Sequence, residues 1–145
     1  MRVFISLLLA VSLMGCATSE VNYFDFPVSK ADQQTVAKDL AWLIKAKHGA
    51  SAVFDFDYPT HSSNTFFSES LEMELRKLGI GVYANEIKDE KSRHNQLYYT
   101  LSRLNNHQFY IKVVVNDHFS FQRIWLINEE VLYPLTTTSV FEGSQ

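Results

Sequence analysis

The last third of the chain alternates between apolar and other residues over three consecutive segments, and no other feature constrains the fold as strongly. The segments are 96–104, 107–116 and 118–127. A period of two places every second side chain on the same face of a strand. One face of each segment gathers apolar residues: Leu97, Tyr99 and Leu101, then Phe109, Ile111, Val113 and Val115, then Phe119, Phe121 and Trp125. The pattern predicts an antiparallel meander.

Turn-forming pairs separate these three segments. Asn105 and Asn106 lie between the first two, and Asn116 and Asp117 lie between the last two. Asparagine and aspartate tolerate the positive φ angles of tight hairpins. Asn105 and Asn106 can take these angles in a tight hairpin turn, and Asn116 and Asp117 offer a second turn.

Two earlier segments have the period of an amphipathic helix. Ser29 is suited to cap the first helix, with Asp32 near its positive end, and Gly49 is suited to end it. The second helix follows a loop that closes on Asn64, and Gly79 ends it. The apolar rows are Val36, Leu40 and Leu43 in the first helix and Phe67, Leu71, Leu75 and Leu78 in the second. Each helix can bury one face on a sheet.

Short apolar stretches predict further strands at 51–57 and 80–83, and a short strand can follow the meander at 131–133. The resulting order is α-β-α-β-β-β, with room for one more short strand. The expected fold class is α+β, a two-layer sandwich in which two helices pack on a mostly antiparallel sheet. The domain is expected to span 30–134, and 135–145 to form a C-terminal tail.

The second face of the sheet is more apolar than a surface in water requires. Tyr98, Tyr110, Val114, Ile124 and Leu126 fall on this face. Such an excess of apolar surface marks a candidate binding face. The alternative is that the N-terminal segment and the C-terminal tail cover it, and the sequence leaves both open.

Arg123 is the one charge in the apolar row that Phe121 and Trp125 share. It is either an edge-strand residue whose stem packs while its guanidinium reaches water, or half of an ion pair with a partner protein. The residues of the sheet that we expect to bind a partner are Tyr110, Arg123, Ile124 and Leu126.

The N-terminus has the order of a bacterial export signal: basic Arg2, twelve apolar or small residues over 3–14, then a small residue before the cut. Leu13-Met14-Gly15-Cys16 resembles the lipobox of bacterial lipoproteins. The resemblance implies that residues 1–15 are a signal peptide, and that Cys16 carries diacylglycerol and an N-acyl chain such as palmitate. Release as a soluble periplasmic protein is the alternative. Twelve residues fall well short of the ~20 that span a bilayer.

Residues 16–29 are expected to be a lipidated tether, of which the thirteen residues 17–29 would reach roughly 40 Å when extended. Tyr23, Phe24 and Phe26 make this segment partly aromatic. These rings either dock on the core of their own domain or add to a partner's surface, so they are candidate partner-binding residues.

Removal of residues 1–15 leaves 130 residues, enough for one domain with its own core. The remaining chain has 12 basic and 16 acidic side chains, a net charge of −4. This charge argues against nucleic acid as a partner, because phosphate binding depends on clustered lysine and arginine. The lipid on Cys16 is therefore the expected membrane attachment.

Few residues suggest catalysis or metal binding. Asp55 and Asp57 leave a predicted strand two residues apart, and His61 follows. Such groups could converge on a metal or a substrate, but acidic residues at a strand's end are also common in turns. The chain lacks the Gly-x-Ser-x-Gly nucleophile motif and a phosphate loop. We expect no catalytic residue, no metal, no small-molecule substrate and no cofactor besides the lipid.

The order of these features resembles the TrbH family of conjugal transfer lipoproteins. The resemblance rests on the lipobox, a second helix that ends in Leu75-Arg76-Lys77-Leu78-Gly79, the strand with Arg123-Ile124-Trp125, and Pro134. It implies a non-enzymatic part of a mating-pair-formation, or type IV secretion, apparatus whose partner is an envelope-spanning channel protein. Ala17 fits an outer-membrane anchor with the domain in the periplasm, because aspartate there is the usual inner-membrane retention signal.

Two other functions stay open. One is an accessory lipoprotein of another envelope machine, such as a secretion or flagellar apparatus. The other is a periplasmic ligand-binding or hydrolytic lipoprotein that uses Asp55, Asp57 and His61.

Overall fold

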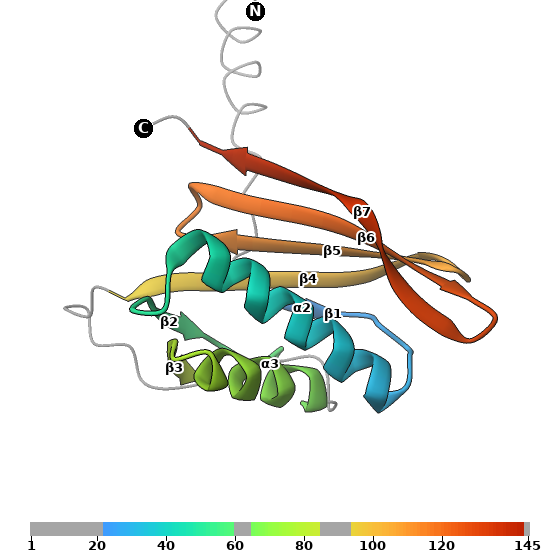
Figure 1. The fold of residues 1–145 in the computed structure, drawn as a ribbon, viewed down its shortest axis with the longest axis horizontal. Helices are drawn as coiled ribbons and strands as arrows, with labels where there is room; N and C mark the ends of the chain where they lie inside the picture. The colour runs from blue at the N-terminus through green and yellow to red at the C-terminus, as the bar shows by residue number, and fades with distance from the viewer. Residues whose placement is uncertain (1–21, 60–64, 85–93, 144–145) are drawn as a thin grey trace, which may run out of the picture.

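The structure is a computed structural model that describes residues 22–59, 65–84 and 94–143. Its elements follow in the order β1 (Tyr23–Phe24), α2 (Lys30–His48), β2 (Val53–Phe56), α3 (Phe66–Lys77), β3 (Gly81–Ala84), β4 (Asn95–Asn105), β5 (Gln108–Val115), β6 (Phe119–Asn128) and β7 (Val131–Glu142). The described residues thus form two helices and a seven-stranded sheet (Figure 1). The predicted α+β fold is confirmed.

The sheet is mixed, with the order β3-β2-β4-β5-β6-β7. Strands β4 to β7 form the predicted antiparallel meander, lengthened by β7. Strand β2 runs parallel to both β3 and β4, and β1 also runs parallel to β4. Because β5 pairs along most of β4, β1 and β2 share the other edge of β4.

The first helix begins and ends where the sequence predicts. The Asp32 amide donates to Ser29 Oγ over 3.1 Å, and Gly49, at φ 80°, donates its amide to the Lys45 carbonyl. Helix α3 begins after Thr65, whose side chain makes no capping hydrogen bond, and Gly79 follows its end at φ 83°. The predicted cap Asn64 lies outside the described residues.

The hairpins differ in their turn geometry. Asn116 and Asp117 have φ angles of 51° and 57°, as expected of the β5–β6 turn. The β4–β5 turn follows Asn105, which pairs with Gln108, and neither Asn105 nor Asn106 adopts positive φ. A register shift in β4 between Arg103 and Asn105 adds local twist there instead.

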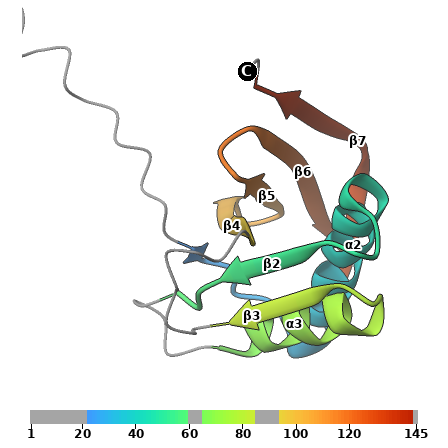
Figure 2. The same cartoon turned by 90° about the vertical axis from the view of Figure 1, so that its left-hand side faces the viewer.

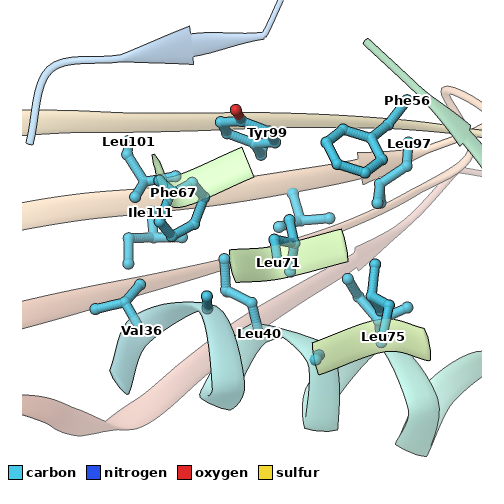
Figure 3. Packing of buried hydrophobic residues seen from close by; sticks show 14 of the residues in the cluster. Val36, Leu40, Phe56, Phe67, Leu71, Leu75, Leu97, Tyr99, Leu101 and Ile111 are labelled. Atoms are coloured by element: carbon cyan, nitrogen blue, oxygen red, sulfur yellow. The ribbon is translucent and has the colours of Figure 1, made fainter. Parts of the chain in front are cut away.

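Both helices pack on one face of the sheet (Figure 2). The core lies between these two layers, and Figure 3 shows Leu40 of α2 and Leu71 and Leu75 of α3 facing the strands. The alternating row predicted for the meander is buried along its whole length, from Leu97 to Trp125, except at half-buried Arg123. Leu43 and Leu78, at the rims of the helix rows, are half-buried. Truncation of one such core leucine to alanine typically costs about 2–5 kcal/mol.

The predicted domain limits are wrong at both ends. Strand β7 continues through Pro134 to Glu142, so most of the predicted tail at 135–145 belongs to the sheet. At the other end, Phe26 is 1% exposed and belongs to the core, although the predicted domain begins at residue 30. Threonine, valine and phenylalanine favour strands, and pairing with β6 orders them here.

Candidate functional site

The open side of the sheet is the largest candidate site. We call it the outer face, and it consists of the side chains of β4 to β7 that point away from the helices. In the described part of the chain, no helix or strand lies over this face (Figure 2). Its apolar members are Tyr98, Tyr110, Val114, Ile124, Leu126, Tyr133 and Phe141.

The strand register arranges these side chains in rows across the outer face. One row runs from Tyr98 through Val114 and Ser120 to Phe141. A second apolar row joins Tyr110 to Ile124, and a third joins Leu126 to Tyr133. Polar residues separate the first row from the others: Thr100, Lys112, Gln122 and Ser139. The outer face therefore presents apolar strips on either side of a polar belt.

The predicted sheet residues Tyr110, Ile124 and Leu126 lie on the outer face, where the alternation placed them. All three are half-buried by their neighbours in the sheet. This partial burial raises the pKa of the Tyr110 phenol, so the ring stays neutral at ordinary pH. These side chains form a neutral, preformed surface.

Arg123 lies on the opposite, helix-facing side and is not available to a partner. Its Nη1 donates to both carboxylate oxygens of Asp39 in α2, over 2.7 and 2.6 Å. Its Nε donates to Thr138 Oγ1 of β7 over 2.8 Å. The arginine side chain is 13% exposed, so the prediction that its guanidinium reaches water or pairs with a partner is wrong. The ion pair ties β6 to α2 within the domain.

The aromatic residues of the predicted tether divide into two groups. Phe26 meets Phe109 edge to face at 4.7 Å between ring centroids, and Phe24 packs on Phe67 at 5.5 Å. These two rings dock on their own domain, so the partner-binding role predicted for Phe26 is wrong. Tyr23 is 42% exposed. Phe24 is half-buried, so Tyr23 is the most exposed of the three rings.

Strand β7 forms an edge of the sheet and exposes large apolar side chains. Val140 is 54% exposed and Phe141 is 55% exposed, on opposite faces of the strand. Val131, Tyr133 and Leu135 are exposed as well. The segment 131–141 has no charged residue. Edge strands normally carry charged side chains that prevent pairing with another chain. Because this segment of β7 has none, we include it in the candidate surface together with the outer face.

A family model described as conjugal transfer protein TrbH matches residues 17–143. The chain belongs to the TrbH family. Comparisons with curated proteins and with solved structures gave no match. Family membership makes this chain a component of conjugal transfer. In the described residues of this TrbH-family protein, no helix is long and apolar enough to cross a membrane.

The acidic residues considered for chemistry come together in a different set. The Asp55 carboxylate bonds to His94 Nδ1 over 2.9 Å and accepts from Gln96 Nε2 over 3.1 Å. The His94 ring stacks on Tyr83 at 4.6 Å between centroids. His61 lies outside the described residues, and the described part of this TrbH-family chain has no group of three or more potential metal ligands among its His, Cys, Asp and Glu side chains.

His94 was not predicted from the sequence, because no local sequence pattern indicates that β2 and β4 are neighbouring strands. The pairing places Asp55 opposite Gln96, two residues after His94. Asp55 is buried, so its hydrogen bonds compensate for its removal from water. The carboxylate orients the imidazole and ties the start of β4 to β2. A parallel-pair prediction would have been needed to find this contact.

Asn22 is a second residue that the sequence did not single out. Its Oδ1 accepts from the Tyr99 amide over 2.8 Å, and its Nδ2 donates to the Asp57 carbonyl. The side chain thus satisfies the backbone of β4 in the buried stretch between its pairing with β2 and its pairing with β1. It fixes where the N-terminal segment joins the domain of this TrbH protein.

Proposed function

We propose that this TrbH-family protein is a non-enzymatic assembly component of a conjugal transfer, or type IV secretion, apparatus. It is anchored in the outer membrane by lipid on Cys16, and its α+β domain lies in the periplasm. The observation that supports a docking role is the outer face, whose apolar rows lie on an antiparallel sheet and are covered by no helix or strand of the described residues. The family membership supports the apparatus.

The anchor follows from the chemistry of Cys16. Diacylglycerol and an N-acyl chain each add about 0.8 kcal/mol of membrane affinity per buried CH₂, so together they make attachment effectively permanent. The tether is then shorter than predicted and consists of residues 16–21, because the described chain joins the sheet at Asn22. The domain is thereby held near the membrane.

Docking follows from the outer face. An envelope-spanning channel protein that covers Tyr110, Ile124 and Leu126 removes their remaining apolar surface from water, at about 25 cal/mol per Å². The polar belt through Lys112 and Gln122 limits how a partner can be positioned, because polar groups that the partner covers must find hydrogen-bond partners on it. This role is non-enzymatic, because no covalent bond in the partner is made or broken.

The first prediction concerns this surface. We expect Ile124→Glu to lower conjugation frequency at least tenfold, because it places a charge in the apolar row that the partner covers. Gln122→Glu is the matched control, since it adds the same charge on the same strand and face, within the polar belt. The measurement is the transfer frequency of donor cells, with the amount of envelope protein that co-purifies with each variant.

Localisation provides the complementary test. Mass spectrometry of the mature protein should find a lipidated Cys16 start, and Cys16→Ser should release the protein from the membrane fraction. Purification of the wild-type protein in a gentle detergent as a bare monomer, with no cross-linked envelope partner in donor cells, would contradict the assembly role.

A second candidate function rests on the Asp55–His94 pair, because an oriented imidazole is a common general base. A periplasmic ligand-binding or hydrolytic role would require both residues. Asp55→Asn and His94→Gln should then abolish transfer while the protein stays folded and membrane-bound. The assembly role predicts that transfer persists in both variants.

A further inference from the structure

The two halves of β7 differ in what they offer at the edge of the sheet. The two-residue turn at Glu129 and Glu130 makes Asn128 and Val131 the closing hydrogen-bonded pair of the hairpin. Bonded pairs alternate along an antiparallel ladder, so Leu132 and Pro134 have backbone groups that point outward. Proline has no N–H, and this half of the edge therefore lacks a donor at Pro134.

The second half of β7 offers a complete set of outward groups. The Gly143 amide donates to the His118 carbonyl over 2.6 Å, which fixes the phase of the ladder at this end. Phe141 then bonds across to Ser120, and Ser139 bonds across to Gln122. The backbone N–H and C=O groups of Thr138, Val140 and Glu142 therefore point away from the sheet. This stretch can accept another strand.

The side chains around these outward groups define the chemistry of the strand that would fit. Val140, on the helix side, and Phe141, on the outer face, are both more than half exposed. Glu142 is held by Lys47 of α2, so its charge is already paired. An added strand would meet apolar side chains on both of its faces and would need no charge of its own.

A second copy of this chain fits the edge less well than a different protein. Two β7 strands related by a two-fold axis would pair over about 17 Å. They would extend the sheet side by side and leave both outer faces uncovered. Stable interfaces bury roughly 800 Å² per partner, which an edge contact of this length does not reach alone. A longer partner can pair with the edge and continue across the outer face, because Phe141 begins the row that leads to Tyr98.

We propose that the partner of this protein in the transfer apparatus donates an uncharged, apolar-rich extended segment that pairs as an added strand with Thr138–Glu142 of β7. The inference rests on the proposed assembly function and names the partner's chemistry at that surface. Main-chain hydrogen bonds to Thr138, Val140 and Glu142 supply the recognition of an extended backbone. Val140 and Phe141 supply the preference for apolar side chains.

Val140 allows the main chain to be tested apart from the side chain. Val140→Pro removes an N–H that points outward, so no hydrogen bond of the ladder to β6 is lost with it. Val140→Ala keeps the N–H and removes the isopropyl group. Both full-length variants are expressed in donor cells, and we expect Val140→Pro to lower co-purification of the envelope partner at least tenfold, while Val140→Ala lowers it less than threefold. Thermal melting and membrane fractionation check that both variants fold and localise like the wild type.

Photo-cross-linking then identifies the segment of the partner that contacts β7. A benzophenone amino acid replaces Phe141 in one variant and Tyr98, at the far end of the same row, in another. We expect the Phe141 position to cross-link to a peptide whose sequence, read by mass spectrometry, is uncharged and alternates apolar residues. A cross-linked peptide that is charged or is a known helix of the partner overturns the proposal.

The outcomes separate this inference from the assembly function. Equal co-purification of Val140→Pro and wild type overturns strand addition, and so does an equal loss in both Val140 variants, which would mean side-chain docking. A dimer in the purified wild type that Val140→Pro dissociates makes a second copy the occupant and also overturns it. If the wild type itself co-purifies with no envelope protein, the assembly function fails, and this inference fails with it.

Discussion

His48 shows how one side chain connects packing with pH. Its ring lies edge to face against Phe54 and Phe119, and its Nε2 is buried without a hydrogen-bond partner among the described residues. Burial first, and the positive charge of Lys47 second, lower the pKa of His48 below its usual value. The unfolded chain therefore binds a proton more readily at this residue than the folded chain does.

The second prediction follows from this sign. Stability contributed by neutral His48 is present above the unfolded pKa of about 6.5 and is lost as pH falls below it, by at most about 1.4 kcal/mol per pH unit. His48→Phe keeps the ring contacts and cannot titrate. We expect urea unfolding at about pH 7 and about pH 5.5 to show a smaller loss of unfolding free energy in His48→Phe than in the wild type.

A matched control is His118→Gln, at an exposed turn, which should keep the wild-type loss. The same pH dependence in the wild type and in His48→Phe would show that His48 does not carry the effect. The deciding quantity is the difference in unfolding free energy between the wild type and His48→Phe at the lower pH.

Single residues were the hardest features to predict. The sequence showed that Arg123 is an unusual charge in an apolar row. Its partner, Asp39, could not be predicted, because the contact depends on how α2 packs across β6 and no local sequence pattern contains that information. Asn22 and His94 contact residues 77 and 39 positions away in the chain. Short-range periodicity carries no information about such contacts.

At the scale of elements, the β6–β7 hairpin carries avoidable strain. Glu129 and Glu130 have φ angles of 50° and 66°, in the left-handed region that costs a residue with a Cβ roughly 1–2 kcal/mol. Turns of this type usually contain Asn-Gly, because glycine adopts positive φ without that cost.

The third prediction is that Glu130→Gly stabilises the protein by about 1 kcal/mol in urea unfolding, through relief of this backbone strain. Glu130→Ala removes the same charge but keeps a Cβ, so it should give no comparable gain. An equal gain in both variants would assign the effect to charge instead of backbone.

Elements with a strong period were predicted correctly, and elements ordered only by their neighbours were not. The two helices and the meander follow from apolar rows with periods of 3.6 and two. A short strand was expected at 131–133, but the continuation of β7 to Glu142 was missed because Pro134 and a run of threonines resemble a chain end. Pro134 is compatible with the sheet because its missing N–H falls at an outward position of an edge, next to a register shift between β6 and β7.

At the scale of the whole molecule, the described N-terminal segment and β7 close the domain. Phe26 fills the core beneath Phe109, and the second half of β7 covers the edge of β6. The limits predicted from sequence, 30–134, would remove both. Loss of a buried phenylalanine alone costs about 3–5 kcal/mol, against a typical total stability of about 5–15 kcal/mol.

The remaining prediction compares two fragments. A fragment of residues 22–143 should melt cooperatively when followed by circular dichroism, because it retains every described contact. A fragment of residues 30–134 should show no cooperative melt. A transition in the shorter fragment within a few degrees of the longer one would mean that neither end contributes to the fold.

The place where Asn22 and β1 join β4 also determines how the domain bears load. Any tension that reaches the domain through residue 22 acts first on the Asn22 side chain and on the parallel pairing of β1 with β4. A pull directed along β1 would shear these hydrogen bonds together instead of opening them one by one. Behind them, the buried ring of Phe26 resists withdrawal. The join is thus a mechanical clamp, and α2 is shielded from the pull.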